Sequence, residues 1–300
     1  MKLFILAGVA ALSCGALVAA CSSSSNKGYA GGGDGGNSGD GGGDAKTGDG
    51  GSSGGGTPYS GTLAAAETTA GVYDIAGSFI ATPDASATAN TCPGSGITSG
   101  SCCYEPPIVA SDAGAADAGT IAVFSAGTIT IKDGTATLAN LNPGTNGAYG
   151  ITSGASNPTV KWTGGDTLAV SAAGATVEAF TGNLVTVVAL AGVTPALSLQ
   201  TATTVPLADP YVVSWTPGTA TTVRVTLIAA KGTAEDGSIS CSVDDSAGTV
   251  SFPTALLSKL TTGDTGIVSL TRTSLNTATG SNVTVQLAST TSSTGLVKFQ

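Results

Sequence analysis

The side chains able to do chemistry in this 300-residue chain are carboxylates and cysteines, because the chain contains no histidine. It has 19 acidic residues, 10 basic residues and 6 cysteines. Without imidazole, neither a Ser-His-Asp nor a Cys-His nucleophile can be assembled. Imidazole metal sites and imidazole pH switches are excluded for the same reason. Any reactive site must therefore be built from carboxylates or thiols.

Two groups of carboxylates could carry such a site. A glycosidase needs only two acids, and Glu105 with Asp166 is the pair that we consider for a polysaccharide-acting enzyme. Glu235-Asp236 and Asp244-Asp245 would offer oxygen ligands to Ca²⁺ in an adhesion module if their two loops met. Both dipeptides precede glycine or serine beside expected strand ends, which is typical of turns. We therefore expect no catalytic residue, no metal site and no cofactor.

Four cysteines beyond the first 21 residues are candidates for disulfides: Cys92, Cys102, Cys103 and Cys241. A bond between the adjacent Cys102 and Cys103 would force a strained ring. We expect Cys92 to pair with Cys102 or Cys103, which closes a loop of about ten residues and contributes roughly 2.5–3 kcal/mol. Cys241 stays open between a buried free thiol and a bridge to the remaining loop cysteine. The missing C-x-x-C spacing argues against a metal site.

The charge of the chain argues against nucleic-acid partners. Its formal net charge is -9, and its basic residues are scattered singly. Such a surface repels phosphate backbones. The chain also has no G-x-x-x-x-G-K-[ST] phosphate loop, and its many Gly-x-Gly matches lie where no strand precedes and no helix follows. Nucleotide binding is therefore not expected.

Residues 1–20 have the composition of a secretory signal. Lys2 precedes an almost wholly apolar or small stretch, Leu3–Leu17, which is too short for a spanning helix. The stretch ends in Val18-Ala19-Ala20-Cys21, which resembles a bacterial lipobox. The resemblance covers residues 1–21 and implies that Cys21 becomes an acylated N-terminus, anchored by fatty acids such as palmitate. Ser22 in the next position is compatible with sorting to the outer membrane.

Residues 21–57 are predicted to form a tether, which consists of the lipidated Cys21 and the Gly/Asp/Ser-rich residues 22–57. Glycine makes up 16 of residues 22–57, so this segment cannot bury enough apolar surface to offset its ordering entropy. A calcium-binding Gly-Asp repeat is not expected, because no large apolar residue lies between Gly31 and Gly56. As a flexible coil the segment spans about 30–36 Å root-mean-square. Its predicted role is to hold the folded part away from the membrane and let it rotate.

From about Pro58 the sequence predicts an all-β fold. Short runs rich in Thr and Val alternate with Gly, Pro, Asn and Asp, as expected for strands. Turn residues predict three hairpins: Ile129–Leu138 around Asp133-Gly134 with Ile131 opposite Ala136, Val160–Val170 with Trp162 opposite Leu168, and a turn at Gly182-Asn183 with Phe180 opposite Val185. The run from Leu184 to Leu190 is nearly all apolar, which predicts a central strand.

Seven short alternating strands are predicted after residue 197, at 211–215, 223–229, 238–243, 249–252, 267–273, 283–289 and 295–299. This rhythm is typical of a β-sandwich. The stretch 197–300 resembles a bacterial immunoglobulin-like module, although it holds only one cysteine and so lacks the inter-sheet disulfide. We therefore expect two antiparallel sandwich-like modules, 58–196 and 197–300, with the second immunoglobulin-like.

The arrangement of lipobox, Gly/Asp/Ser-rich tether and β modules resembles a group of uncharacterised bacterial envelope lipoproteins. The resemblance implies a non-catalytic protein on the outer membrane whose β modules have a structural or binding role. Its partners would be the membrane, through the lipid anchor, and a protein or glycan ligand contacted by strand-connecting loops such as 84–119. The polysaccharide-acting enzyme and the Ca²⁺-dependent adhesion module are the alternatives.

Overall fold

The computed structural model describes residues 58–69, 71–81, 96–107, 122–154, 157–232 and 234–300, and these form an almost purely β structure. The predicted all-β class is confirmed. The elements, in chain order, are β1 (Tyr59–Thr69), β2 (Val72–Ala81), β3 (Ile97–Ser99), β4 (Cys102–Glu105), β5 (Ile129–Asp133), β6 (Ala136–Leu141), β7 (Tyr149–Thr152), β8 (Thr167–Ala172), β9 (Phe180–Val185), β10 (Thr203–Val205), β11 (Tyr211–Ser214), β12 (Thr222–Lys231), β13 (Ala234–Asp244), β14 (Thr249–Phe252), the short helix α2 (Thr254–Leu257), β15 (Thr265–Thr279) and β16 (Val283–Phe299).

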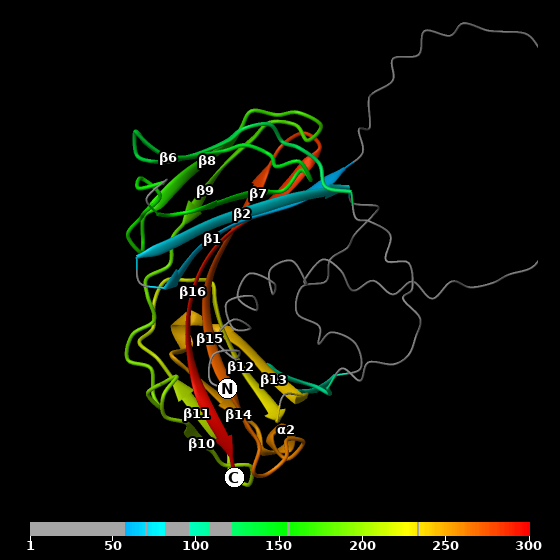
Figure 1. The fold of residues 1–300 in the computed structure, drawn as a ribbon, viewed down its shortest axis with the longest axis vertical. Coiled ribbons are helices and arrows are strands. Elements are labelled where there is room, and N and C mark those ends of the chain that lie inside the picture. Colours follow the sequence, from blue (N-terminus) through cyan, green and yellow to red (C-terminus); the bar gives the residue numbers. More distant parts are fainter. Residues whose placement is uncertain (1–57, 70, 82–95, 108–121, 155–156, 233) are drawn as a thin grey trace, which may run out of the picture. The chain divides into compact units, whose positions relative to one another are not determined.

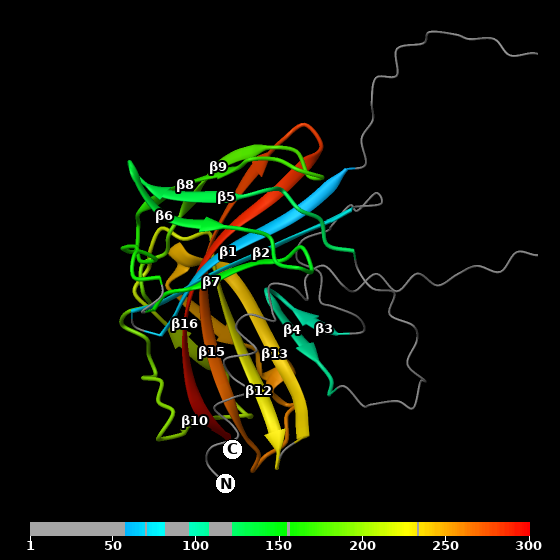
Figure 2. The same cartoon turned by 45° about the horizontal axis from the view of Figure 1, so that its top comes forward.

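Two long strands, β15 and β16, organise the molecule. They pair antiparallel over their whole common length, and at about 3.3 Å per residue the 15 residues of β15 span about 50 Å. On one side β12, β13, β4 and β3 follow β15, and on the other β1, β2 and β7 follow β16. Figures 1 and 2 show β15 and β16 running between an upper and a lower group of strands. Most pairs are antiparallel, but β1 and β10 pair parallel to β16.

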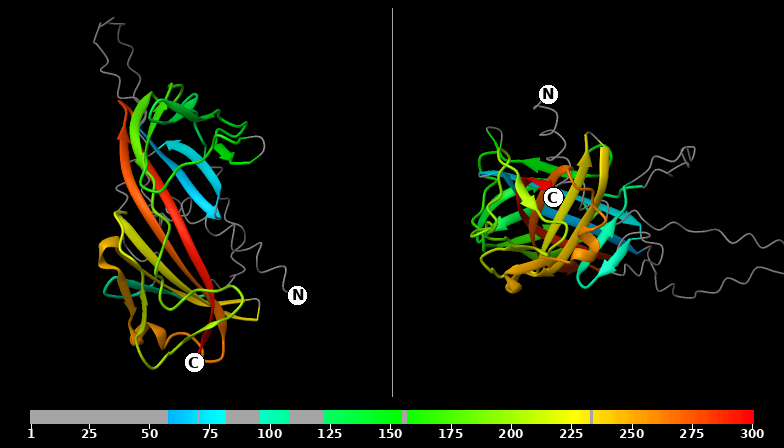
Figure 3. Two further views of the ribbon diagram at one scale, coloured as in Figure 1. Left: turned by 90° about the vertical axis from the view of Figure 1, so that its left-hand side faces the viewer. Right: turned by 90° about the horizontal axis from the view of Figure 1, so that it is seen from below.

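Two hydrophobic cores lie along these shared strands. The first is formed by buried side chains of β1, β2, β5 to β9 and the adjoining ends of β15 and β16, with Phe79, Ile131 and Leu184 among its members. The second is formed by β10 to β14, α2 and the other ends of β15 and β16, and includes Phe252 and Phe299. The left view of Figure 3 shows the same two strand groups joined by β15 and β16, the long orange and red strands.

The cores do not follow the predicted boundary at residue 196/197. Ala278, Val283, Val285 and Leu287 belong by sequence to the second predicted module, yet they are buried in the first core. The reason is the length of β16, which merges the two predicted strands 283–289 and 295–299 into one strand of 17 residues. The described residues from Pro58 to Gln300 form a single compact unit. Whether 197–300 folds by itself stays a prediction.

The predicted strands after residue 197 are otherwise found, and the one at Thr249–Phe252 matches β14 at both ends. The local hairpins fare worse. β5 and β6 do form a hairpin, but Ile131 lies opposite Ala139 rather than Ala136. The turn is moved by one residue to Gly134-Thr135, because Gly134 takes the left-handed conformation with φ 54°, and a bulge follows next to Ile131.

The other two predicted hairpins are wrong. Trp162 is buried but lies in no strand, and β8 pairs with β5 and β9 instead of with 160–164. Gly182 and Asn183 form no turn but lie within β9, which ends at Val185 and not at Leu190. Gly182 is needed there for a close approach of strands: a Cβ at this position would lie 2.6 Å from the Ala278 Cβ and 2.8 Å from the Leu287 Cδ1.

Candidate functional site

One disulfide among the described residues joins the two predicted modules. Cys102 of β4 and Cys241 of β13 are opposite one another in register, and their sulfur atoms are 2.04 Å apart. Of the two predicted partners of Cys92, Cys102 is therefore excluded, and Cys241 forms a bridge rather than a free thiol. Cys103 is also disulfide-bonded. Cys92 lies outside the described residues, so its pairing with Cys103 stays a prediction.

The calcium site considered for the two acidic dipeptides is not assembled. Glu235-Asp236 lies near the start of β13 and Asp244-Asp245 at and just beyond its end. Eight residues of extended strand from Asp236 to Asp244 correspond to about 26 Å. No single ion can be held by both. Within the described part of the chain, no cluster of three or more Cys, Asp or Glu residues could hold a metal, and no helix is long and apolar enough to cross a membrane.

Asp236 instead meets Asp264, which lies in the turn just before β15. Their side chains are hydrogen-bonded to each other, and the Thr261 hydroxyl donates to Asp236 Oδ2 over 2.7 Å. The Thr261 hydrogen bond is the main reason that the pKa of Asp236 is lowered, with Asp264 contributing too. Burial, and then Asp236, raise the pKa of Asp264. Asp264 Oδ2 is buried without a hydrogen-bond partner among the described groups, which fits Asp264 as the protonated member of a pair that shares one proton.

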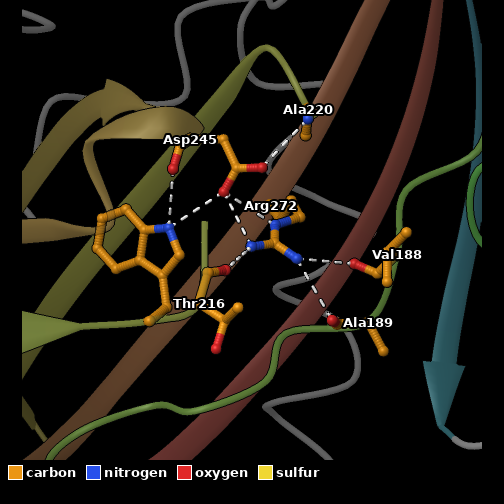
Figure 4. A network of polar contacts seen from close by, with 7 residues as sticks. Val188, Ala189, Thr216, Ala220, Asp245 and Arg272 are labelled. Atoms are coloured by element: carbon orange, nitrogen blue, oxygen red, sulfur yellow. Dashed lines mark hydrogen bonds and ion pairs between the residues drawn. The ribbon is translucent and has the colours of Figure 1, made fainter. Parts of the chain in front are cut away.

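Asp245 lies in a buried polar network with Arg272 of β15, in the region drawn in Figure 4. The Arg272 Nη2 and the Asp245 Oδ1 are 2.9 Å apart, and both side chains are almost fully inaccessible. Trp215 donates through Nε1 to the same Oδ1 at 3.0 Å, and the Ala220 amide donates to Oδ2 at 3.1 Å. The carboxylate thus accepts bonds from three separate segments.

The guanidinium of Arg272 is satisfied on its other sides by main-chain carbonyls. Its Nη2 donates to Thr216 O at 2.7 Å, and its Nη1 donates to Val188 O at 3.1 Å and Ala189 O at 3.3 Å. These bonds hold the 188–189 connection, which runs from the first core towards the second, against β15. With both charges paired and buried, the network is a structural clamp and offers no reactive group to solvent.

The two acids considered for a glycosidase are not brought together. Glu105 ends β4, where it lies opposite Ser238 beside the second core. Asp166 lies next to the first core, and its Oδ2 accepts the Thr163 amide at 2.6 Å and so closes the turn before β8. Neither residue lines the cleft described next. The structure therefore gives the pair no common site.

An open cleft of about 450 Å³ lies where β2 begins and β7 ends. It is lined by nine described residues: Gly71, Val72, Tyr73, Ser153, Gly154, Asn157, Pro158, Val160 and Lys161. Its volume falls within the range of about 300–1,000 Å³ that is typical of small-molecule sites. We call it the β2–β7 cleft. Sequence reasoning missed it, because its walls come from three segments that are brought together only by the pairing of β2 with β7.

The walls of the β2–β7 cleft are held by local bonds. The Tyr73 amide donates to Ser153 Oγ at 2.8 Å, and the Ser153 amide donates to Tyr73 O at 2.7 Å. The Tyr73 ring packs on Trp162 with centroids 4.6 Å apart, which fixes one wall as an aromatic surface. Asn157 Nδ2 donates to Thr152 O at 3.1 Å, which orients the amide. These contacts fix the positions of Tyr73, Ser153 and Asn157 around the open space.

Polar groups are left over for a ligand in this cleft. Ser153 uses its oxygen as an acceptor and keeps a hydroxyl proton to donate. Asn157 donates one amide proton to Thr152 O, and its Oδ1 stays available as an acceptor. Lys161 is exposed and forms no ion pair within the described part of the chain. Donors, an acceptor, a cation and an aromatic ring thus surround one open space.

Comparison with known proteins gives little further guidance. No protein-family model matches the chain, and no curated protein matches it. Among solved structures, the FN1–FN3 domains of chicken CNTN1 are similar at a TM-score of 0.24 and 8% sequence identity, over 79% of this chain and 69% of that one. The fold is therefore defined here by the strand pairing of the chain itself.

Proposed function

We propose that the protein is a non-catalytic lipoprotein of the bacterial cell envelope that displays its β structure on the outer membrane for a binding role. The observation that carries the proposal is Val18-Ala19-Ala20-Cys21 directly after a short apolar stretch. Two or three acyl chains on Cys21 would give an essentially permanent anchor, since each buried CH₂ contributes about 0.8 kcal/mol. The glycine-rich tether to residue 57 would supply reach.

The state of the carboxylates supports the non-catalytic part of the proposal. Asp245 is neutralised by Arg272, and Asp166 is bonded to the Thr163 amide. Asp236 and Asp264 are bonded to each other. A two-acid hydrolase needs a pair of carboxyls about 5–10 Å apart across a cleft that admits the sugar. The β2–β7 cleft is lined by no acid among its described residues.

The anchor is tested by replacing the cysteine that would carry it. The wild-type chain, Cys21→Ala and the matched control Cys14→Ala, which alters a cysteine inside the apolar stretch, are expressed and partitioned between detergent and aqueous phases. We expect wild type and Cys14→Ala in the detergent phase and Cys21→Ala in the aqueous phase or still unprocessed. Equal aqueous partitioning of all three would refute the anchor.

The outward display of the protein is tested separately on intact cells. Protease added outside the cells should remove the protein if it is displayed outward, and should leave it if it faces the periplasm. The orientation decides which molecules the β structure can meet. Reducing-sugar release from polysaccharides by the purified protein, abolished in Glu105→Gln, would overturn the non-catalytic proposal.

A further inference from the structure

We propose that the β2–β7 cleft binds an acidic sugar residue, such as a uronic acid unit of a polysaccharide. The inference rests on the binding role proposed above and names the chemistry of its ligand. The aromatic wall, the unpaired cation and the free hydrogen-bonding groups each select for one part of such a ligand.

The described lining of the cleft carries a positive charge, whereas the chain as a whole is acidic. The protein carries 19 acidic and 10 basic residues, yet the described residues that line the cleft include one cation, Lys161, and no acid. Lys161 forms no ion pair within the described ranges. Glu67 lies at the rim, where its Oε1 accepts the Gly71 amide at 3.1 Å. Lys161 is nevertheless the one charged group of the described lining, and an exposed lysine attracts a carboxylate within a Debye length of about 8–10 Å.

The remaining walls suit a ring that is apolar on its face and polar at its edge. The Tyr73 side chain is partly exposed and stiffened by its contact with Trp162. A rigid aromatic surface presents large contact area at low conformational entropy cost. A sugar places C–H groups on its face and hydroxyls at its rim, where the Ser153 hydroxyl can donate and Asn157 Oδ1 can accept.

The openness of the site fits a sugar within a longer chain. The cleft is bounded by β2, by the end of β7 and by the Asn157–Lys161 segment, and it is open to solvent rather than enclosed. An open site can accept one unit of a polysaccharide whose neighbouring units stay in solvent. A deep pocket, which would select a free small molecule, is not present among the described residues.

The proposal is tested by titrating the full-length chain with short oligogalacturonates and measuring binding by calorimetry. The neutral arm uses galactose oligomers of the same length, and a third arm uses inorganic phosphate. We expect the acidic oligomer to bind, the neutral one to bind at least tenfold more weakly, and phosphate not to compete. Higher salt should weaken binding, because one charge pair contributes.

The site is assigned by variants. Lys161→Ala should weaken oligogalacturonate binding roughly tenfold to hundredfold, the loss expected for a hydrogen bond to a charged group. Lys161→Arg should retain most of it. Lys132→Ala, an exposed lysine on the β5–β6 hairpin outside the cleft, is the matched control and should bind as wild type. Thermal melts confirm that each variant is folded.

Three results would overturn the inference. They are no binding of oligogalacturonate at millimolar concentrations, equal loss in Lys161→Ala and Lys132→Ala, and phosphate binding as tight as that of the acidic sugar. The last result would mean a simple anion site. None of them bears on the anchor, since detergent partitioning of Cys21→Ala decides that question without reference to the cleft.

Discussion

Removal of the Asp245 carboxylate should destabilise the protein strongly. Asp245→Ala leaves the Arg272 guanidinium buried without its counter-ion and removes the acceptor of Trp215 Nε1 and of the Ala220 amide. Breaking a buried ion pair by removing one partner costs about 3–5 kcal/mol. For a domain of 150–250 residues each kcal/mol lowers Tm by about 2–4 °C, so we expect a fall of roughly 6–20 °C.

The measurement is urea or thermal unfolding of wild type, Asp245→Ala and Asp209→Ala. Asp209 is exposed and serves as the matched control, with an expected change within about 0.5 kcal/mol. A double variant, Asp245→Leu with Arg272→Met, removes both charges and fills the space with apolar groups, so it should recover much of the loss. A cost below about 1 kcal/mol in Asp245→Ala would refute the clamp.

Three further predictions follow from the packing, the disulfide and the acid pair. Gly182→Ala should destabilise by about 1–3 kcal/mol, because its Cβ would meet Ala278 and Leu287, whereas Gly150→Ala, with nothing within 4 Å, should be tolerated in the same urea titration. Replacing both Cys102 and Cys241 by alanine should lower the free energy of unfolding by about 2–5 kcal/mol. Reductant should then lower the Tm of this variant by less than it lowers the Tm of wild type, because the variant already lacks this bridge. Asp264 has a raised pKa in the fold, so its stabilisation is complete at low pH and is lost as pH rises through that pKa. Asp264→Asn should therefore gain in Tm relative to wild type between about pH 3 and pH 8, and a pH-independent difference would contradict the shared proton.

Other titratable groups near the acid pair set the background of that pH experiment. The pKa of Asp236 is lowered, whereas that of Asp264 is raised. The stability that the ionised Asp236 contributes is therefore lost as pH falls. Lys231 favours the charged form of both carboxyls. The pKa of Tyr104 is raised, by burial and by Asp236, so it titrates only in alkali. Lys231 and Tyr104 are common to both proteins, whereas Asp236 has a different partner in Asp264→Asn, so the comparison reports on the acid pair as a unit.

Strand identity in the C-terminal half could be predicted because alternation is local. Val223, Val225 and Leu227 are all fully buried, as their spacing in β12 requires. The continuity of β16 could not be predicted. Ser289 to Thr294 carry no apolar alternation, yet they pair with β15 in unbroken register. These residues cross between the two cores, where Ser289 is buried and accepts the Val187 amide.

The alternation of side chains along a strand also indicates the buried network. In the predicted strand 267–273, Arg272 shares a face with Val268 and Leu270, which are buried. An arginine on an inward face needs an acidic partner. Local pattern cannot name that partner, because Asp245 reads as a turn residue and lies 27 residues away. The β2–β7 cleft escaped for a similar reason, since its walls are separated by up to 90 positions from Gly71 to Lys161.

The cysteines show what a local preference leaves out: it allows a bridge from Cys92 to Cys103, which stays a prediction, but it does not favour the bridge from Cys102 to Cys241. Loop closure costs about 0.6 kcal/mol more for each doubling of loop length. The entropic free energy of closing a loop of 139 residues is therefore only about 2 kcal/mol larger than that of closing a loop of ten. Once Cys102–Glu105 adds as a strand to β13, four residue pairs of main-chain bonding and the burial of Cys241 fix its sulfur beside that of Cys102. Strand pairing outweighs so small an entropic preference, so the partner of Cys102 follows from sheet order and not from proximity in sequence.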